Sequence, residues 1–173
     1  MTMTIRVGMG YDVHRLARGR PLILGGVAIS SDLGLEGHSD ADVVVHAICD
    51  ALLGACGAGD IGRHFPDNDP SYSGVSSLVL LREVREIVAR RDLRPLNVDA
   101  TIVLQEPKIK EFIPAMENNI AETLAIDPTL VNIKATTTEG LGFVGHGEGI
   151  AAYAAATLAA VPSKESSPAD KKR

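Results

Sequence analysis

The sequence lacks tryptophan and is poor in other aromatic residues, which make up 3% of its 173 residues. It also lacks a basic run in the body of the chain, and its formal net charge is −5. Proteins that hold single-stranded nucleic acids stack bases on aromatic side chains along a basic groove, and duplex binding depends on cations that neutralise phosphates. We therefore expect no nucleic-acid partner.

Two further absences bear on the cellular compartment. No apolar stretch reaches the roughly 20 residues that a helix needs to cross a bilayer, and the N-terminal MTMTIRVG lacks the basic-then-apolar pattern of a signal peptide. The two cysteines, Cys49 and Cys56, would lie about 10 Å apart along a helix, too far for a disulfide. We expect reduced cysteines, no membrane contact and a cytoplasmic protein.

Apolar residues are abundant enough for one core, since 45% of the chain is hydrophobic. A chain of this length buries roughly 70% of its unfolded surface, so we expect a single domain over residues 1–161. Residues 162–173, PSKESSPADKKR, contain no apolar side chain beyond proline and alanine. This composition cannot support a core, and a disordered tail is expected.

Hydrophobic periodicity divides the domain into helices and strands. Strands are expected over 5–16, 21–29, 95–105 and 131–138, and helices over 40–56, 76–91 and 110–124. The first two strands flank a short turn, which favours a hairpin in which Gly25 and Gly26 form a bulge or bend. The segment 57–72, rich in glycine, proline and aspartate, is expected to be a loop without regular structure.

The segment 149–161, GIAAYAAATLAAV, is ambiguous. Alanine is the best helix former, so propensity favours a helix, whereas burial on both faces of a sheet would override propensity and give a strand. The order of the elements indicates an α+β fold, a mixed β-sheet with helices packed on one face. The other face of the sheet would be apolar, so we expect further copies of the chain to bury it.

Asp12, His14 and His46 are the strongest candidates for a functional site. Residues two apart on a strand point to the same face, so Asp12 and His14 project together, and His46 lies near the middle of the predicted helix 40–56. One carboxylate and two imidazoles leave a fourth tetrahedral position open, which is typical of catalytic zinc. The alternative for His46 is an ordinary hydrogen-bonded core histidine.

Three acidic or basic residues share one stripe of the 40–56 helix. Asp42, His46 and Asp50 are spaced at i, i+4 and i+8. Ser39 and Asp42 have the spacing of a capping box at the helix start. Asp42 therefore either caps the helix or accepts a hydrogen bond from the second ring nitrogen of a ligating histidine, and Asp50 is expected on a solvated face.

Three other segments supply groups that suit phosphate or polyol ligands. Residues 136–139, Thr-Thr-Thr-Glu, follow a strand directly; hydroxyls bond phosphate oxygens and a carboxylate binds magnesium or manganese, although threonine is also an ordinary strand residue. The segment 105–110 closes a strand with two lysines and is either a phosphate contact or a solvated loop. The acidic segment 60–69 is expected to be a functional loop.

Taken in order, these motifs closely resemble the 2-C-methyl-D-erythritol 2,4-cyclodiphosphate synthases. The matching stretches cover most of the chain: GYDVH at 10–14, GHSDADVVVHAICDALLGA at 37–55, GDIGRHFPDNDP at 59–70, NVDATIVLQEPKI at 97–109 and NIKATTTEGLGFVGHGEGIA at 132–151. The resemblance implies a strand over 149–161, and a homotrimer with active sites between subunits.

The resemblance also implies an activity, that of a phosphorus–oxygen lyase in the non-mevalonate isoprenoid pathway. The 2-phosphate of 4-diphosphocytidyl-2-C-methyl-D-erythritol 2-phosphate would attack the β-phosphorus of the same molecule, and CMP would leave. Two alternatives stay open from the residues alone. A metal-dependent phosphatase or nucleotidase would use an activated water instead, and a zinc-stabilised trimeric binding protein would have no turnover.

Individual roles follow from the same resemblance. Zn²⁺ would be held by Asp12, His14 and His46, and a second ion, Mg²⁺ or Mn²⁺, by Glu139 and the substrate diphosphate. Two residues match positions that stabilise the transition state, His38 and Thr137. The positions that match contacts to the cytidine diphosphate-linked substrate, or to the trimer cavity, are Ser39, Asp60, Ile61, Gly62, Phe65, Pro66, Asp67, Asn68, Asp69, Leu104, Gln105, Glu106, Pro107, Lys108, Ile109, Lys110, Thr136, Thr138, Phe143 and His146.

The chain departs from the family pattern at His146, where relatives commonly carry arginine, and at Gly140, where many carry lysine. Arginine stays charged and grips phosphate through two hydrogen bonds, whereas histidine near neutral pH mostly does neither. The resemblance places His146 at the central cavity of the trimer, where relatives hold an isoprenoid diphosphate. We expect geranyl diphosphate to bind weakly, and more weakly at higher pH; calorimetry at two pH values tests this, and tight, pH-independent binding would contradict it.

Overall fold

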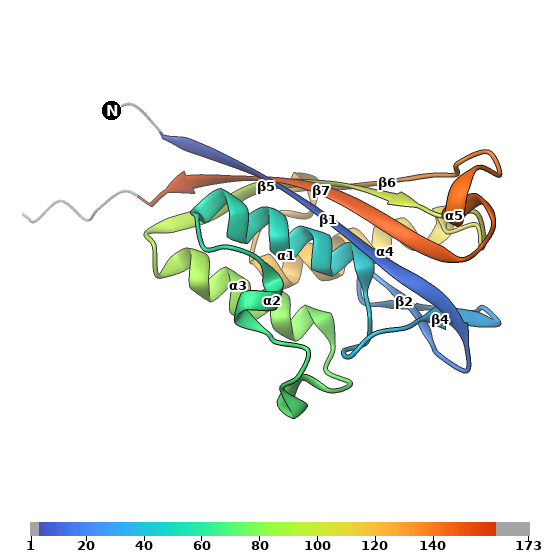
Figure 1. Cartoon of the computed structure of the whole chain (residues 1–173). Helices are drawn as coiled ribbons and strands as arrows, with labels where there is room; N and C mark the ends of the chain where they lie inside the picture. Colours follow the sequence, from blue (N-terminus) through green and yellow to red (C-terminus); the bar gives the residue numbers. More distant parts are fainter. Residues whose placement is uncertain (1–3, 162–173) are drawn as a thin grey trace, which may run out of the picture.

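The structure, a computed structural model, describes residues 4–161 and contains one five-stranded sheet. The strands follow the order β4-β1-β7-β5-β6 (Figure 1). Their bounds are Ile5–Arg18 for β1, Leu33–Leu35 for β4, Leu93–Val103 for β5, Val131–Thr136 for β6 and Gly149–Ala160 for β7. A separate small sheet pairs β2 (Leu22–Leu24) with β3 (Val27–Ile29). The predicted tail, 162–173, lies outside the described residues.

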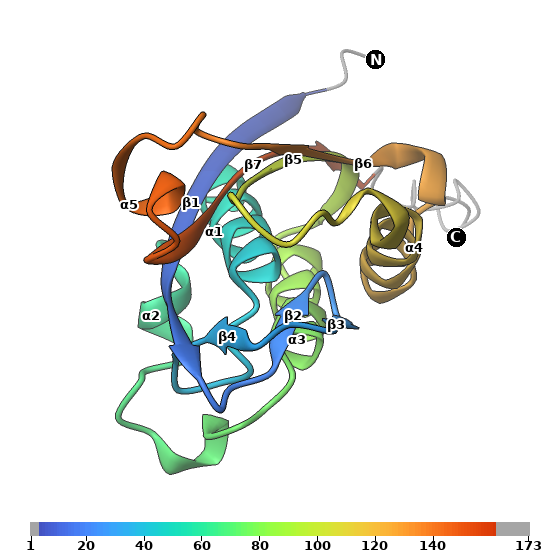
Figure 2. The ribbon, with the colours of Figure 1, turned by 90° about the vertical axis from the view of Figure 1, so that its right-hand side faces the viewer.

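Three longer helices lie on one side of the main sheet, as Figures 1 and 2 show. They are α1 (Val43–Cys56), α3 (Ser77–Ala89) and α4 (Ile113–Leu124). The single turns are α2 (Ile61–His64), α5 (Gly142–Gly145) and the 3₁₀ turns η1 (Pro70–Tyr72), η2 (Lys110–Phe112) and η3 (Pro128–Leu130). The apolar stripes of the three helices form one core with the facing side of the sheet. The predicted α+β fold is therefore confirmed.

The alanine-rich last segment is a strand, β7, at the centre of the sheet. It pairs antiparallel with β1 from Gly149 to Ala159 and antiparallel with β5 on its other edge. Small side chains here let α1 pack closely against the sheet, and tertiary burial outweighs the helix propensity of alanine. The prediction of a strand over 149–161 is confirmed.

The predicted hairpin between the first two strands is wrong. β1 pairs with β7 and β4 instead, and the run 21–29 folds back on itself as the β2–β3 hairpin. Gly25 and Gly26 have φ values of 57° and 73°, the left-handed conformation that a two-residue hairpin turn demands at both central positions. The two glycines are thus a turn and not a bulge.

Helix α1 begins one residue after Asp42, so the predicted capping box starting at Ser39 is wrong. The Asp42 carboxylate accepts hydrogen bonds from the backbone N–H groups of Val44 and Val45 at the helix start. It also accepts from Gly25 at 3.0 Å and Gly26 at 2.6 Å, in the β2–β3 turn. Of the two roles open for Asp42, the structure shows the cap. Burial raises the pKa of this carboxyl to about 6.

Replacing Asp42 with asparagine is expected to destabilise the fold by about 2 kcal/mol, because the new amide N–H group would face the donor of Gly26 in a buried site. Urea unfolding of the purified chain measures this. Asp127→Asn is the matched control, since Asp127 also caps a helical turn but is exposed. Equal midpoints for both variants would contradict a special role for the Asp42 carboxylate.

The predicted loop 57–72 contains more structure than expected. Asp60 caps α2 through the N–H of Arg63, and Asp69 caps η1. Asp50 of α1 is half-buried and accepts a 2.7 Å hydrogen bond from the N–H of Ile61. The expectation that Asp50 lies on a solvated face is therefore wrong, because its carboxylate anchors the start of α2 to α1.

The face of the sheet that points away from the helices exposes large apolar side chains. They occupy alternate positions of β1 and one position of β7: Ile5, Val7, Met9, Tyr11, Val13 and Tyr153. The three longer helices lie on the opposite side of the sheet and do not cover this face (Figure 1). Within residues 4–161, no helix is long and apolar enough to cross a membrane, and Cys49 and Cys56 are buried and unpaired.

Candidate metal centre and cavities

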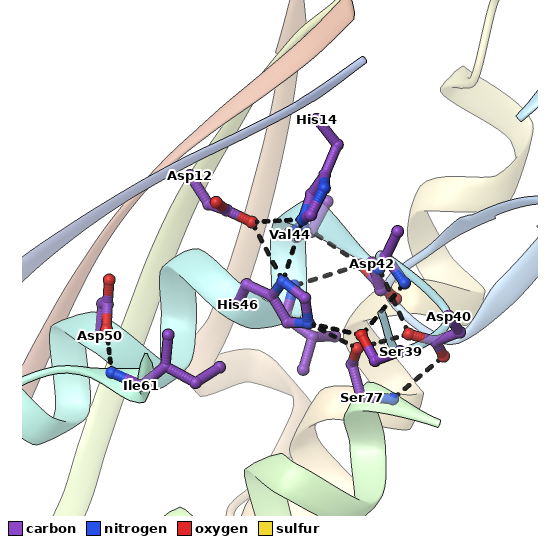
Figure 3. A network of polar contacts seen from close by, with 12 residues as sticks. Asp12, His14, Ser39, Asp40, Asp42, Val44, His46, Asp50, Ile61 and Ser77 are labelled. Atoms are coloured by element: carbon purple, nitrogen blue, oxygen red, sulfur yellow. Dashed lines mark hydrogen bonds and ion pairs between the residues drawn. The ribbon is translucent and has the colours of Figure 1, made fainter. Parts of the chain in front are cut away.

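Asp12, His14 and His46 converge on one point between β1 and α1, as Figure 3 shows. Asp12 Oδ2 lies 3.0 Å from His14 Nε2 and 3.1 Å from His46 Nδ1, and the two ring nitrogens are 3.2 Å apart. Among residues 4–161 this is the one such group of histidine, cysteine and acidic side chains. The predicted convergence is confirmed.

The three ligand atoms fit a tetrahedral metal ion. Atoms bound to zinc at about 2.1 Å in a tetrahedron lie roughly 3.4 Å from one another, close to the separations seen here. His14 Nδ1 lies 2.8 Å from the carbonyl oxygen of Glu36, and donating a proton there leaves Nε2 free to bind a metal. The donor set therefore suits zinc with a fourth position open.

The pKa values of Asp12 and His14 are shifted by their contacts with each other. Burial tends to raise the pKa of Asp12, but hydrogen bonding and attraction between its carboxylate and the rings of His14 and His46 outweigh it and hold that pKa well below its usual range. Burial tends to lower the pKa of His14, yet its hydrogen bond and attraction to Asp12 raise it. Asp12 therefore stays ionised, and a cation that binds here would replace the proton that His14 otherwise tends to hold.

Asp12, His14 and His46 form part of the wall of a cavity of about 240 Å³. His38 and Ser39 line it beside them, and His38 Nε2 donates a 2.9 Å hydrogen bond to the carbonyl oxygen of Asp69. Of the predicted substrate residues, the loop contributes Ile61, Gly62, Phe65 and Asp67. Tyr72 and Leu80 also line the cavity, but neither was singled out from the sequence, because nothing in the local pattern marks them.

A second cavity, also of about 240 Å³, lies at the ends of β5 and β6. Its lining contains most of the predicted nucleotide segment: Leu104, Gln105, Pro107, Lys108, Ile109, Lys110, Thr136 and Thr137. β6 ends at Thr136, so Thr137 and Thr138 lie in a loop and are not strand residues.

Other predicted residues line neither cavity. Asp60, Pro66, Asn68 and Asp69 lie in or beside the loop of the first cavity, and Glu106 and Thr138 lie beside the second. Glu139 is exposed, with a φ of 53°, and accepts a 3.0 Å hydrogen bond from Thr137 Oγ1. It is not part of the Asp12 cluster. Phe143 lines a third cavity with His14, and His146 is exposed 3.8 Å from Glu148.

The chain is thus an α+β protein in which one carboxylate and two imidazoles that could hold a metal ion lie at the wall of a cavity. It matches the YgbB family over residues 5–159. The 2-C-methyl-D-erythritol 2,4-cyclodiphosphate synthase of Pelotomaculum thermopropionicum is 60% identical over 154 residues, covering 89% of this chain and 95% of the relative. That of Geobacter sulfurreducens is 61% identical over 150 residues, covering 87% and 96%.

Solved structures agree with these sequence relatives. The bifunctional IspDF of Campylobacter jejuni superposes with a TM-score of 0.89 at 43% identity, over 92% of this chain and 43% of that longer one. The IspF of Plasmodium falciparum, in complex with CDP, superposes with a TM-score of 0.80 at 33% identity, over 94% and 100%. The chain therefore belongs to the YgbB family, and the resemblance to cyclodiphosphate synthases is confirmed.

Proposed function

We propose that this chain converts 4-diphosphocytidyl-2-C-methyl-D-erythritol 2-phosphate into 2-C-methyl-D-erythritol 2,4-cyclodiphosphate and CMP, as a phosphorus–oxygen lyase of the non-mevalonate pathway. The observation that carries the proposal is the convergence of Asp12, His14 and His46 at a cavity, in a chain 60% identical to a synthase of that name. The CDP complex of the Plasmodium falciparum relative supports a cytidine diphosphate-linked ligand.

The chemistry needs positioning more than it needs a protein nucleophile. An oxygen of the 2-phosphate forms a bond to the β-phosphorus, and the bond from that phosphorus to the bridging oxygen breaks, so CMP leaves with the bridging oxygen. Because both reacting groups belong to one molecule, catalysis depends on aligning them and on stabilising charge. A chain with a net charge of −5 offers no bulk attraction for phosphates, so cations must act locally.

Each proposed site residue has a role that its position supports. Asp12, His14 and His46 would hold Zn²⁺, which when bound supplies Lewis-acid polarisation of a phosphate oxygen. Glu139 is the proposed ligand of a second ion, Mg²⁺ or Mn²⁺, since its carboxylate is exposed beside the second cavity. His38 lines the wall of the first cavity and Thr137 that of the second, and both are proposed to steady the transferring phosphoryl group.

We also propose that the chain forms a homotrimer with active sites between subunits. Within one chain the predicted residues are divided between two separate cavities, and Glu139 lies away from the Asp12 cluster, so a neighbouring copy is needed to complete the site. The open apolar face of the sheet supports this, because a contiguous apolar surface of such side chains marks an interface. Met9, 76% exposed, is its most exposed large residue on β1.

Replacing Met9 with lysine is expected to dissociate the trimer into monomers and to remove activity, because a charged side chain would be buried without a partner. Light scattering after size-exclusion chromatography measures the mass. Val79→Lys is the matched control, since Val79 is an exposed apolar residue of α3, on the helix side of the sheet. A trimer that survives Met9→Lys would contradict the proposed interface.

Phosphorus NMR of the products tests the reaction itself. The proposal predicts a cyclic diphosphate together with CMP, and loss of both when a chelator removes the metal. A phosphatase or nucleotidase would instead release inorganic phosphate from the same substrate. A binding protein would leave the substrate unchanged with metal present, which would also overturn the proposal.

A further inference from the structure

We propose that Asp40 and Ser77 are positioning residues of the metal centre, which hold the His46 ring with its proton on Nε2 and its lone pair on Nδ1 facing the metal. The inference rests on the proposed metal role of Asp12, His14 and His46. Its basis is a series of hydrogen-bonded side chains that contacts His46 on the side of the ring away from Asp12 (Figure 3). Neither Asp40 nor Ser77 was singled out from the sequence.

The contacts run from a carboxylate through a hydroxyl to the imidazole. Ser77 Oγ donates a short hydrogen bond to Asp40 Oδ1, and the Ser77 N–H donates to Asp40 Oδ2 at 3.0 Å. His46 Nε2 lies 2.9 Å from Ser77 Oγ. Ser77 is fully buried, with 0% exposure, so water does not compete for its hydroxyl group.

Proton counting then sets the tautomer of His46. A serine hydroxyl has one proton to donate, and a carboxylate only accepts. Since the proton of Ser77 goes to Asp40, Ser77 Oγ can only accept from His46, which places the proton of the ring on Nε2. The lone pair is then on Nδ1, which lies 3.1 Å from Asp12 Oδ2 and 3.2 Å from His14 Nε2. Nδ1 is thus the nitrogen that faces the other two ligands.

A competing hydrogen bond favours the opposite tautomer, and the contacts of Asp40 and Ser77 must outweigh it. With the proton on Nδ1, His46 would donate to Asp12, which suits a centre without metal but blocks metal binding. Ser39 Oγ, at 3.2 Å from Nε2, is the other nearby hydroxyl. It accepts from the N–H of Ala41, and its own proton could be donated to Nε2 only in this opposite tautomer. Ser77, closer and bonded to a carboxylate, is the stronger acceptor. Partners of this kind behind a ligating imidazole are worth 10–100-fold in metal affinity.

Metal affinity and the imidazole tautomer test the proposal together. The full chain is stripped of metal, and its affinity for Zn²⁺ is measured by competition with a chromophoric chelator. We expect Ser77→Ala to weaken Zn²⁺ binding by about 10–100-fold, with Asp40→Asn causing a smaller loss in the same direction. Nitrogen-15 NMR of the metal-free protein should show the His46 ring shifting toward the Nδ1-protonated form in both variants.

The matched control is Thr123→Val, which removes another buried hydroxyl, one that donates to the carbonyl oxygen of Asn119 in α4. It should keep the wild-type affinity and the wild-type His46 tautomer. If Ser77→Ala does not fold, Asp40→Asn tests the proposal instead, because it keeps the Ser77 hydroxyl group. Unchanged affinity and tautomer in the folded variants would overturn the inference. Absence of Zn²⁺ binding by the folded wild type would overturn the proposed metal centre itself, and the inference with it.

Discussion

Replacing His46 with alanine is expected to lower the rate of cyclodiphosphate formation by about 10³-fold or more while leaving the chain folded. The imidazole is one of three proposed zinc ligands, whose atoms lie about as far apart as tetrahedral coordination requires. Losing it removes a charge-stabilising cation worth several kcal/mol at the transition state, and each 1.36 kcal/mol is about tenfold in rate. The measurements are CMP release, zinc content and thermal unfolding of the same preparation.

His64→Ala is the matched control for this prediction. His64 is also half-buried, but its Nε2 donates to the carbonyl oxygen of Ala58, and it does not belong to the metal trio. This variant should keep its zinc and most of its activity. If His46→Ala unfolds while His64→Ala does not, the metal is structural, and the rival hypothesis of a zinc-stabilised binding protein gains support. Full activity of His46→Ala without bound zinc would contradict the proposed role of the metal.

The parts of the site that were predicted from the sequence depend on local spacing. Strand alternation places Asp12 and His14 on one face of β1, and helical periodicity places His46 on α1. Which side chains share a face is decided within a few residues, so the pattern is visible without the fold. That the two faces meet is decided by tertiary packing. The combination of one carboxylate and two imidazoles suggested it, and the resemblance to a family supported it.

The features that were missed depend on contacts distant in sequence. The pairing of β1 with β7 joins residues near opposite ends of the domain, whereas local turn signals favoured a neighbouring hairpin. Ser77 reaches His46 from the start of another helix, 31 residues along the chain, and no spacing rule connects them. Asp42 was recognised as a possible cap, but its bonds to the β2–β3 turn required that turn to be placed first. Such contacts follow from packing and not from periodicity.

Replacing Gly10 with alanine is expected to destabilise the fold by about 3 kcal/mol or more, the upper range for overpacking a core. A Cβ atom at Gly10 would lie 1.9 Å from the carbonyl oxygen of Ala47 and 2.7 Å from the nitrogen of Ala51. Both atoms belong to the backbone of α1, so no side-chain rotation relieves the clash, and the helix must move away from β1. Because Gly10, Asp12 and His14 face the same side of the strand, that displacement also separates His46 from its partner ligands.

Thermal unfolding and Zn²⁺ affinity test the two consequences together. For a chain of this size, the loss corresponds to a fall of about 10 °C in the unfolding midpoint, and the folded fraction should bind Zn²⁺ more weakly. Gly54→Ala is the matched control on the same interface, since its Cβ would approach nothing closer than the carbonyl oxygen of Met9 at 3.9 Å. Alanine is the better helix former there, so a gain of up to about 1 kcal/mol is expected. Equal midpoints for the two variants would show that α1 does not rest on β1 at the distance that aligns the three metal ligands.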